Sequence, residues 1–279
     1  MRLTKIKRRI VDVVIMLVSL CIGVIIVFPI FYGFSGAFMS LGEFSQYPPP
    51  ILPRSFLNFD NFIHVFTHVP MVRFIVNSVI VSVFGTSVRL LLSVMAAYAI
   101  VFLDFKGKSF VFFLVLGTMM LPGDTLVVVN FLSIMSLNLL DTYLGITIVH
   151  FVSAMQLFLL RQSFRSTPRE LRDAALIDGC GNMRFFMNIL LPISKPILIT
   201  LYVQSFVGLW NLYLWPLMVT NTNDMRTVQI GVAMLTTPYG TNYDIVMAGV
   251  AIILVPSLLV FILLRRIIVR GMLAGALVG

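Results

Sequence analysis

Long apolar runs without a charged residue constrain this chain more than any other feature. Val13–Gly42 contains no Asp, Glu, Lys or Arg, and neither does Ile245–Leu264. A helix needs about 20 apolar residues to cross the hydrocarbon core of a bilayer. Only 11% of the 279 residues are charged, against about 25% in a typical soluble domain. The sequence therefore predicts an integral, all-α membrane protein.

Six apolar segments are long enough to be transmembrane helices, and together they predict one transmembrane domain over residues 1–279. Arg89 interrupts the second segment. Pro122 and Gly123 interrupt the third, where they are expected to break or kink the helix. The segments are Val13–Gly42, Phe74–Leu103, Ser109–Phe131, Thr142–Leu160, Pro196–Thr220 and Ile245–Leu264.

The distribution of positive charge predicts the orientation of these segments. With the N-terminus in the cytoplasm, 16 of the 20 lysines and arginines lie on the cytoplasmic side. Basic residues near the ends of transmembrane helices are retained on that side. Both termini are therefore expected to be cytoplasmic. The excess of basic residues reflects topology, and we expect no nucleic-acid partner.

The predicted outer loop, from Glu43 to about Pro70, has four prolines between Pro48 and Pro53, followed by an aromatic-rich stretch. This pattern predicts an extended entry and then a short amphipathic helix on the outer surface. A lid over the transmembrane helices and a surface for a partner are both consistent with it.

A polar stretch at about residues 165–192 lies between the fourth and fifth apolar segments. Thr167 followed by Pro168 and Glu170 is typical of a helix start with a capping box. Gly179 favours a left-handed residue that ends this helix. Asn182 is expected to cap a second short helix, which Pro192 would end. The sequence thus predicts a helix–turn–helix on the cytoplasmic side.

The second of these helices carries several apolar side chains that need a cover. They are Met183, Phe185, Phe186 and Ile189. The inner membrane surface and a hydrophobic groove of a second protein would both provide one.

This stretch resembles the EAA loop of ABC importer permeases. Asp173-Ala174-Ala175, Gly179, Ile189 and Leu191-Pro192 have the spacing of that motif, with Asp173 in place of the usual Glu. The stretch "MAAYAIVFLDFKGKSF" from Met95, "WNLYLWPL" from Trp210 and the glycine-rich tail resemble the carbohydrate branch of the same family, especially its glycerol 3-phosphate permeases. The resemblance covers nearly the whole chain.

The resemblance implies that the loop is held in a cleft of a cytoplasmic ATPase and transmits its movement to the transmembrane helices. The implied partners are an ABC ATPase dimer, a second homologous permease, an extracytoplasmic solute-binding protein and membrane lipid, in the cytoplasmic membrane of a bacterium. The residues expected to couple to the ATPase are Glu170, Asp173, Ala174, Ala175, Asp178, Gly179, Arg184, Phe185, Ile189 and Pro192.

No catalytic or cofactor motif is recognisable. The only "GKS", Gly107–Ser109, has Phe102 where a phosphate-binding loop requires its first glycine. We therefore expect ATP and Mg²⁺ to be bound by the partner ATPase. His64, His68 and His150 are scattered, and we expect no metal site. The alternative function is a stand-alone ion-coupled carrier, which would need ionisable sites near the middle of the membrane.

Six residues are candidates for the solute pathway: Arg89, Asp124, Gln204, Trp210, Asn211 and Tyr213. Aromatic faces and amides suit sugar rings and hydroxyls, although tryptophans at a membrane interface fit the same pattern. Arg89 and Asp124 are expected at the same depth if both segments are continuous helices of about 1.5 Å per residue. Three arrangements are consistent with this: a structural pair, an Arg89 that faces the pathway, or no pair at all. The sequence does not identify the solute.

Overall fold

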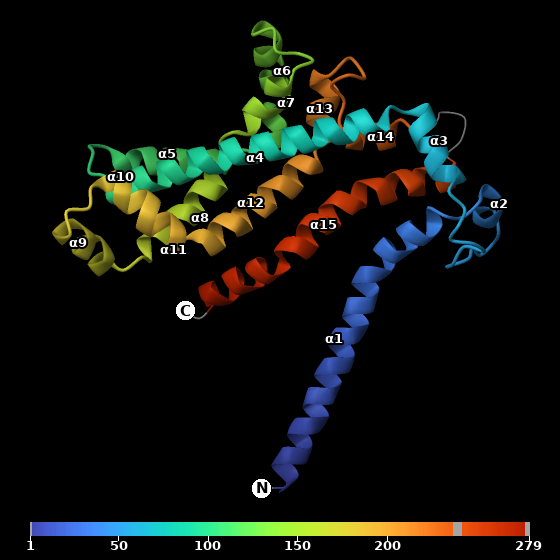
Figure 1. The fold of residues 1–279 in the computed structure, drawn as a ribbon, viewed down its shortest axis with the longest axis horizontal. Coiled ribbons are helices and arrows are strands. Elements are labelled where there is room, and N and C mark those ends of the chain that lie inside the picture. Colours follow the sequence, from blue (N-terminus) through green and yellow to red (C-terminus); the bar gives the residue numbers. More distant parts are fainter. Residues whose placement is uncertain (1, 237–241, 277–279) are drawn as a thin grey trace. The chain divides into compact units, whose positions relative to one another are not determined.

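The computed structural model describes residues 2–236 and 242–276, and all regular secondary structure in these ranges is helical (Figure 1). Side chains are described for residues 11–123, 125–168, 170–236 and 242–263. The chain forms two compact units, one of residues 1–71 and 231–255 and the other of residues 72–230 and 256–279. Each unit is described by itself.

The first unit begins with the long helix α1 (Arg2–Gly36) and continues with α2 (Leu41–Phe44) and α3 (Asp60–His68). Helix α3 is the short helix predicted for the outer loop. The Asn61 side-chain amide donates to the carbonyl oxygens of Ala37 and Met39 at 3.0 and 2.7 Å. The Phe38 ring contacts the rings of Phe56, Phe59 and Phe62. These contacts fasten α3 to the end of α1.

Glu43 organises the turn at α2 as a buried carboxylate. Its Oε2 accepts from the Ser40 backbone N–H at 2.8 Å, and its Oε1 accepts from the Arg54 backbone N–H at 2.7 Å. These two N–H donors hold the pKa of Glu43 below its ordinary value, against the opposing effect of burial. The proline-rich segment is therefore tied back to α2.

Four helices build the core of the second unit: α4 (Met71–Phe102), α5 (Lys108–Thr118), α8 (Ala154–Arg165) and α12 (Lys195–Trp210). Val94, Phe112, Leu160 and Leu201, one from each helix, belong to one cluster of buried apolar side chains. A Cβ at Gly85 would lie 2.8 Å from a methyl of Leu209, so this glycine permits close packing of α4 on α12.

Shorter elements connect these helices. They are η1 (Gly123–Leu126), α6 (Val127–Ser136), α7 (Tyr143–Thr147), η2 (Ile148–His150), α9 (Arg169–Ile177), α10 (Asn182–Phe185), η3 (Phe186–Leu190), α11 (Leu191–Ile193), α13 (Leu214–Val219) and α14 (Val228–Ala233), before the long last helix α15 (Tyr243–Ala276).

Three described helical stretches are long and apolar enough to cross a membrane: Val11–Gly36, Met71–Phe102 and Tyr243–Leu263. Two bent pairs bring the number to five if each is one crossing. Tyr143–His150 meets Ala154–Arg165 at 51°, and Asn182–Ile193 meets Lys195–Trp210 at 75°. The predicted long apolar helices are thus present for the first, second and sixth segments. The fourth is bent, and the fifth is divided between α12, which ends at Trp210, and α13, which begins at Leu214.

The third predicted segment is not a continuous helix. Helix α5 ends at Thr118, and α6 begins only at Val127. Pro122 lacks an N–H for the helical ladder, which is the break expected from the sequence. Each of the two helices is too short to cross a bilayer alone. The number of crossings therefore depends on whether α5 and α6 act together.

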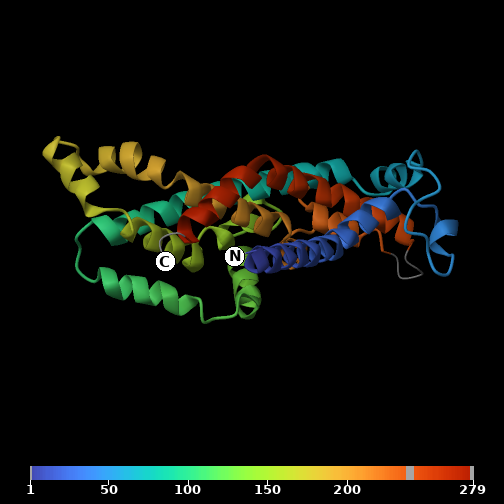
Figure 2. The same ribbon diagram turned by 90° about the horizontal axis from the view of Figure 1, so that it is seen from below.

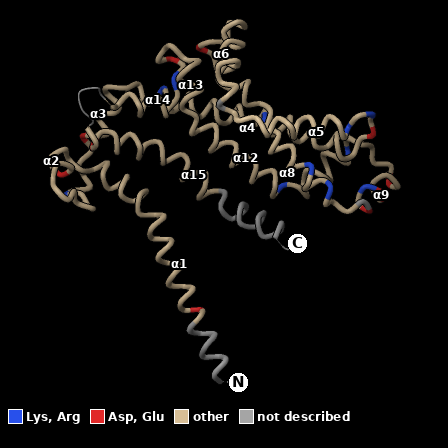
Figure 3. Tube along the Cα trace, turned by 180° about the vertical axis from the view of Figure 1, so that it is seen from behind, with Lys and Arg blue, Asp and Glu red and all other residues tan. Residues whose placement is uncertain are grey.

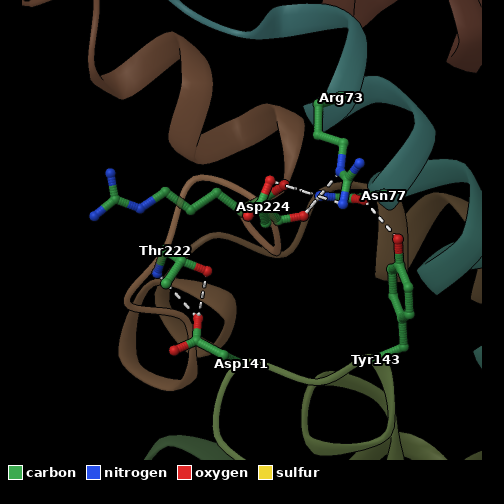
Figure 4. Close-up of polar contacts among 7 residues, drawn as sticks. Arg73, Asn77, Asp141, Tyr143, Thr222 and Asp224 are labelled. Atoms are coloured by element: carbon green, nitrogen blue, oxygen red, sulfur yellow. Dashed lines mark hydrogen bonds and ion pairs between the residues drawn. The ribbon is translucent and has the colours of Figure 1, made fainter.

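The 220–227 loop, between α13 and α14, is held by hydrogen bonds from two other parts of the second unit (Figure 4). Asp141 Oδ1 accepts from the backbone N–H groups of Asn221 and Thr222 at 2.7 and 3.0 Å. The Asn77 side-chain amide donates to the carbonyl oxygens of Asp224 and Arg226 at 2.8 and 2.9 Å. The Tyr143 hydroxyl donates to Asn77 Oδ1, which fixes the orientation of that amide.

Candidate functional site

The predicted helix–turn–helix is present as a segment of residues 168–193. Figures 1 and 2 place its first helix, α9, at one end of the second unit. The helix begins at Arg169, with Pro168 in the capping position. The predicted capping box of Thr167 and Glu170 is wrong, because no side chain caps this helix. The ring of Pro168 fixes φ near the value that a helix start needs, and proline has no N–H group that needs a partner. The helix therefore starts without a side-chain cap.

Gly179 ends α9 in the left-handed conformation that the sequence predicts, with φ +70°. The Cys180 N–H donates to the Ala175 carbonyl at 2.8 Å, and the Gly179 N–H donates to the Leu176 carbonyl at 3.0 Å. This pair of bonds is a Schellman motif, which requires φ above zero at the glycine position. A Cβ at Gly179 would meet no atom within 4 Å. The positive φ of the backbone, and not a lack of space, therefore favours glycine at this position.

The second helix differs from the prediction at both ends. Asn182 is its first residue, and the capping position is Gly181. Pro192 lies inside the helical segment, which ends at Ser194. The expected stop at Pro192 is wrong because the preceding turn is widened: the Leu191 N–H donates to Phe186, five residues back. A π-type turn makes room for the proline ring that a regular α-helix would not accommodate.

The aromatic residues of the second helix point into the chain and not toward a partner. Phe185 and Phe186 are buried, and their rings lie 5.4 Å from Phe102 and 4.7 Å from Tyr98, centroid to centroid. The Tyr98 hydroxyl also donates to the Asn182 carbonyl at 2.9 Å. The expectation that Phe185 and Phe186 need an external cover is therefore wrong, since the end of α4 covers them.

A different set of apolar side chains faces outward from the helix–turn–helix. Ile177 is 87% exposed and Met183 is 71% exposed. Leu171, Leu176 and Met187 are exposed beside them. The alanine pair is divided, with Ala175 buried and Ala174 exposed. Among the other predicted coupling residues, Ile189 is half-buried. The exposed ones are Glu170, Asp173, Asp178, Arg184 and Pro192. The segment is thus packed by one face and presents a mixed apolar and charged second face.

A partly open cavity of about 240 Å³ lies between α4, α8 and α12 in the second unit. Arg89 and Gln204, both predicted pathway residues, line it together with Gln156 and Ser205. The Arg89 Nε–H donates to the His150 carbonyl, which orients the guanidinium. At about 30 Å³ per water the cavity would hold roughly eight waters, so it fits one polar part of a larger solute.

Gln156 is the residue of this cavity that the sequence interpretation missed. It is 3% exposed, and neither its amide oxygen nor its amide nitrogen has a partner among the described residues. Leaving a buried polar group unpaired costs about 1–3 kcal/mol. A glutamine within the charge-free segment Thr142–Leu160 is the sequence signal, since polar side chains at membrane depth are usually functional. The amide therefore has unused hydrogen-bonding capacity at the wall of the cavity.

The remaining pathway candidates lie elsewhere. Trp210 is 1% exposed and stacks on Phe206, and Asn211 Oδ1 accepts from Gln229 at 3.1 Å. Tyr213 is exposed. Trp215 is buried, and its indole N–H donates to the Ile146 carbonyl at 3.1 Å. Burial of both tryptophans inside the unit contradicts the interpretation of an interfacial aromatic belt.

The predicted match in depth between Arg89 and Asp124 stays untested, but its premise is wrong. It assumed a continuous third helix, whereas α5 ends at Thr118 and the chain then turns through Met119–Pro122 before η1. The side chain of Asp124 lies outside the described side chains. A pair between the two residues therefore stays a prediction.

No group of three His, Cys, Asp or Glu side chains in the described part of the chain is arranged to hold a metal ion. His64 and His68, the nearest sequence pair, stack on each other in α3 with ring centroids 5.0 Å apart. His68 Nδ1 lies 3.0 Å from the His64 carbonyl oxygen, within hydrogen-bond distance.

Comparison with known proteins identifies the family of this chain. The sequence profile of the binding-protein-dependent transport system inner membrane component matches residues 2–273. The chain belongs to this family. Its members are inner-membrane permease components of ABC importers, so this permease is a multi-pass protein of the bacterial inner membrane.

Two curated permeases are similar over most of their length. The arabinooligosaccharides transport system permease protein of Halalkalibacterium halodurans is 39% identical over 230 residues, which are 82% of each chain. The sn-glycerol-3-phosphate transport system permease protein of Yersinia pestis is 35% identical over 264 residues, which are 91% of this permease and 94% of the relative.

The fold is shared with solved structures of a bacterial ABC transporter involved in the import of the acidic polysaccharide alginate. One chain superposes with a TM-score of 0.81 at 21% identity, over 92% of this permease and 96% of that chain. A second, from that transporter in complex with its alginate pentasaccharide-bound periplasmic protein, gives a TM-score of 0.57 at 19% identity, over 95% and 97%.

Proposed function

We propose that this permease moves a sugar or a glycerol 3-phosphate-like solute across the cytoplasmic membrane, driven by ATP hydrolysis in a separate ATPase. Membership of the importer family carries the proposal. The relatives named for arabinooligosaccharide and glycerol 3-phosphate transport indicate a hydroxyl-rich, neutral or anionic solute. An ATPase dimer, a second permease and an extracytoplasmic solute-binding protein complete the importer, and this subunit is not itself an enzyme.

In this proposal the permease crosses the membrane six times with both termini in the cytoplasm. The three continuous helices, the bent pair Tyr143–His150 with Ala154–Arg165, and α12 with α13 supply five crossings, and α5 with α6 supplies the broken sixth. The helix–turn–helix is then cytoplasmic, together with Lys106, Lys108 and the basic residues near the end of α8. Labelling of Ile177→Cys from the inside only, and of Leu57→Cys from the outside only, tests this topology, whereas the reverse pattern contradicts it. Both variants are made in a background without the native Cys21 and Cys180.

The outward face of the helix–turn–helix is the proposed coupling surface. Exposed Leu176, Ile177 and Met183 would bury apolar area in a groove of the ATPase. Exposed Glu170, Asp173 and Arg184 would form the polar rim. The opposite face is packed on α4 through Phe185 and Phe186, so movement of the segment would be passed to a transmembrane helix.

The cavity of Arg89, Gln156 and Gln204 is the proposed contact of this subunit with the solute. A guanidinium and two amides offer donors and acceptors to hydroxyl, carboxylate or phosphate groups. Gln156→Leu removes the amide at similar volume, and we expect uptake to fall about tenfold, the effect of one or two lost hydrogen bonds. Met155→Leu, at the edge of the same cavity, is the control and should retain uptake. Equal uptake by Gln156→Leu and wild type would remove the cavity from the pathway.

Reconstitution tests the proposed function as a whole. The permease is placed in vesicles alone and with the ATPase, second permease and binding protein, and uptake is measured for an arabino-oligosaccharide, glycerol 3-phosphate and an alginate oligosaccharide. ATP-dependent uptake by the full set only is expected. Uptake by the permease alone, driven by an ion gradient, would favour the stand-alone carrier.

A further inference from the structure

A second cavity, of about 530 Å³, lies where the end of α4, the start of α5, the end of α8 and the start of α9 meet. Four basic residues line it: Lys108, Arg161, Arg165 and Arg172. The carboxylates in its wall are Asp104 and Asp173. Figure 3 shows lysines and arginines gathered where α5, α8 and α9 lie close together. The lining is therefore more basic than acidic.

The arginines of this cavity are not neutralised by the protein. Lys108 Nζ lies 3.0 Å from Asp104 Oδ1, so those two charges compensate each other. Among the side chains that the structure describes, Arg161, Arg165 and Arg172 take part in no ion pair. The Nε of Arg161 is buried without a hydrogen-bond partner. Three arginines against one remaining carboxylate leave an excess of positive charge.

Two of the arginines are held by aromatic rings in a way that leaves their donors available. The guanidinium carbon of Arg161 lies 3.9 Å from the centroid of the Phe112 ring, and that of Arg172 lies 5.5 Å from the Phe102 centroid. A ring satisfies the face of a guanidinium but not its N–H groups, which point outward in its plane. Planar N–H donors in this arrangement suit the oxygens of a phosphate.

We propose that this cavity binds the phosphate of an anionic phospholipid. The start of α5 supplies both parts of such a site. Lys108 begins the helix at the cavity, and the exposed Phe110, Phe113 and Leu114 give the other faces of the same helix an apolar surface for acyl chains. Basic residues between helices at the membrane interface attract anionic headgroups.

The position of the cavity gives the lipid a role beyond solvation. Thr167, Arg172 and Asp173 belong to the wall and also to the start of the helix–turn–helix. A bound phosphate would fix α9 against the ends of α5 and α8. This lipid site is additional to the proposed transport function. Bound lipid would set how firmly the helix–turn–helix is held against α5 and α8.

Binding of lipid to the purified full-length protein tests the proposal without any transport assay. Native mass spectrometry is carried out during titration with dihexanoyl phosphatidylglycerol, dihexanoyl phosphatidylcholine and inorganic phosphate in separate experiments. Phosphatidylglycerol should bind at least about tenfold more tightly than phosphatidylcholine, and inorganic phosphate should bind only weakly. Equal binding of the two lipids overturns the site, and phosphate binding as tight as that of phosphatidylglycerol overturns its assignment to lipid.

Variants locate the binding in the cavity. The double change Arg165→Gln and Arg172→Gln should weaken phosphatidylglycerol binding about 30-fold, while Arg165→Lys with Arg172→Lys should retain most of it. Lys106→Gln, in the same connection but outside the cavity, is the matched control and should bind as wild type does. Unchanged binding by the double Gln variant, or equal losses in the double Gln and Lys106→Gln variants, places the lipid elsewhere.

Discussion

The helix–turn–helix and the 220–227 loop occupy two ends of the second unit and are held in opposite ways. In the 220–227 loop, the backbone N–H groups of Asn221 and Thr222 donate to Asp141. The carbonyl oxygens of Asp224 and Arg226 accept from Asn77, which, like Asp141, lies in another part of the same unit. Helix α9 has no side-chain cap and exposes Leu176 and Ile177. One segment has several of its backbone polar groups bound by the rest of the unit, and the other presents exposed apolar side chains. This difference agrees with the proposal that the helix–turn–helix docks on another protein.

The largest expected effect separates the two faces of the helix–turn–helix. Phe185→Ala should destabilise the permease by about 3–5 kcal/mol, because it empties a buried position against Phe102. Ile177→Ser should leave stability within about 0.5 kcal/mol and weaken association with the ATPase about 30-fold, since an exposed side chain loses only its partner contact. Thermal unfolding and co-purification measure the two quantities. A large loss of stability in Ile177→Ser would contradict the division into inward and outward faces.

The turn between α9 and α10 should be the next most sensitive feature. Gly179→Val forces a β-branched residue to φ +70°, at a cost of about 1–2 kcal/mol or more. We expect about a tenfold fall in uptake per ATP hydrolysed, with normal insertion into the membrane. Gly181→Val is the matched control, because Gly181 has φ −68° and equally open surroundings. If Gly179→Val in the reconstituted importer takes up as much solute per ATP hydrolysed as wild type, the proposed role of this turn is contradicted.

The 220–227 loop should open when Asp141 loses its charge. Partial burial raises the pKa of Asp141, but the Thr222 and Asn221 backbone N–H groups outweigh it and hold the pKa below the ordinary 3.8. The stabilisation is fully present above this ordinary value and is lost as pH falls through the lower folded-state pKa. Asp141→Asn should speed amide hydrogen exchange at Asn221 and Thr222 about fivefold at neutral pH. Exchange unchanged in the variant would show that other contacts hold the loop.

The smallest effect is expected at the Arg73–Asp224 ion pair of the same loop. The two charges are 3.8 Å apart, and their side chains are 51% and 79% exposed. Such pairs contribute about 0.5 kcal/mol or less in solvent. Asp224→Asn should keep the Asn77 bond to the residue 224 carbonyl, and its exchange rates should lie close to wild type. A change as large as that of Asp141→Asn would mean that charge, not backbone hydrogen bonding, anchors the loop.

Much of the helix–turn–helix was predictable because its signals are local. Gly179 was predicted as left-handed, and the Schellman bonds of Cys180 and Gly179 confirm it. The stop at Pro192 was wrong because the compensating change is a widened turn at Phe186–Leu190, which no single residue specifies. The direction of Phe185 was missed because the ring that covers it, Phe102, is far away in the sequence.

By itself, the sequence determined that this chain is a helical membrane protein, where its apolar helices lie and which stretch resembles the coupling loop of importer permeases. These three features depend on composition and on spacings between residues close in the sequence. In lipid the backbone N–H and C=O groups of a segment must be hydrogen-bonded within its own helix, so an apolar run long enough to span is enough to predict a helix. Only the tertiary structure decided that Arg89, Gln156 and Gln204 share one cavity, and that Arg161, Arg165 and Arg172 share another. Arg89, Gln156 and Gln204 come from three helices far apart in the chain, and the three arginines of the neighbouring α8 and α9 meet the ends of α4 and α5. The packing of these helices, not a local pattern, forms both cavities.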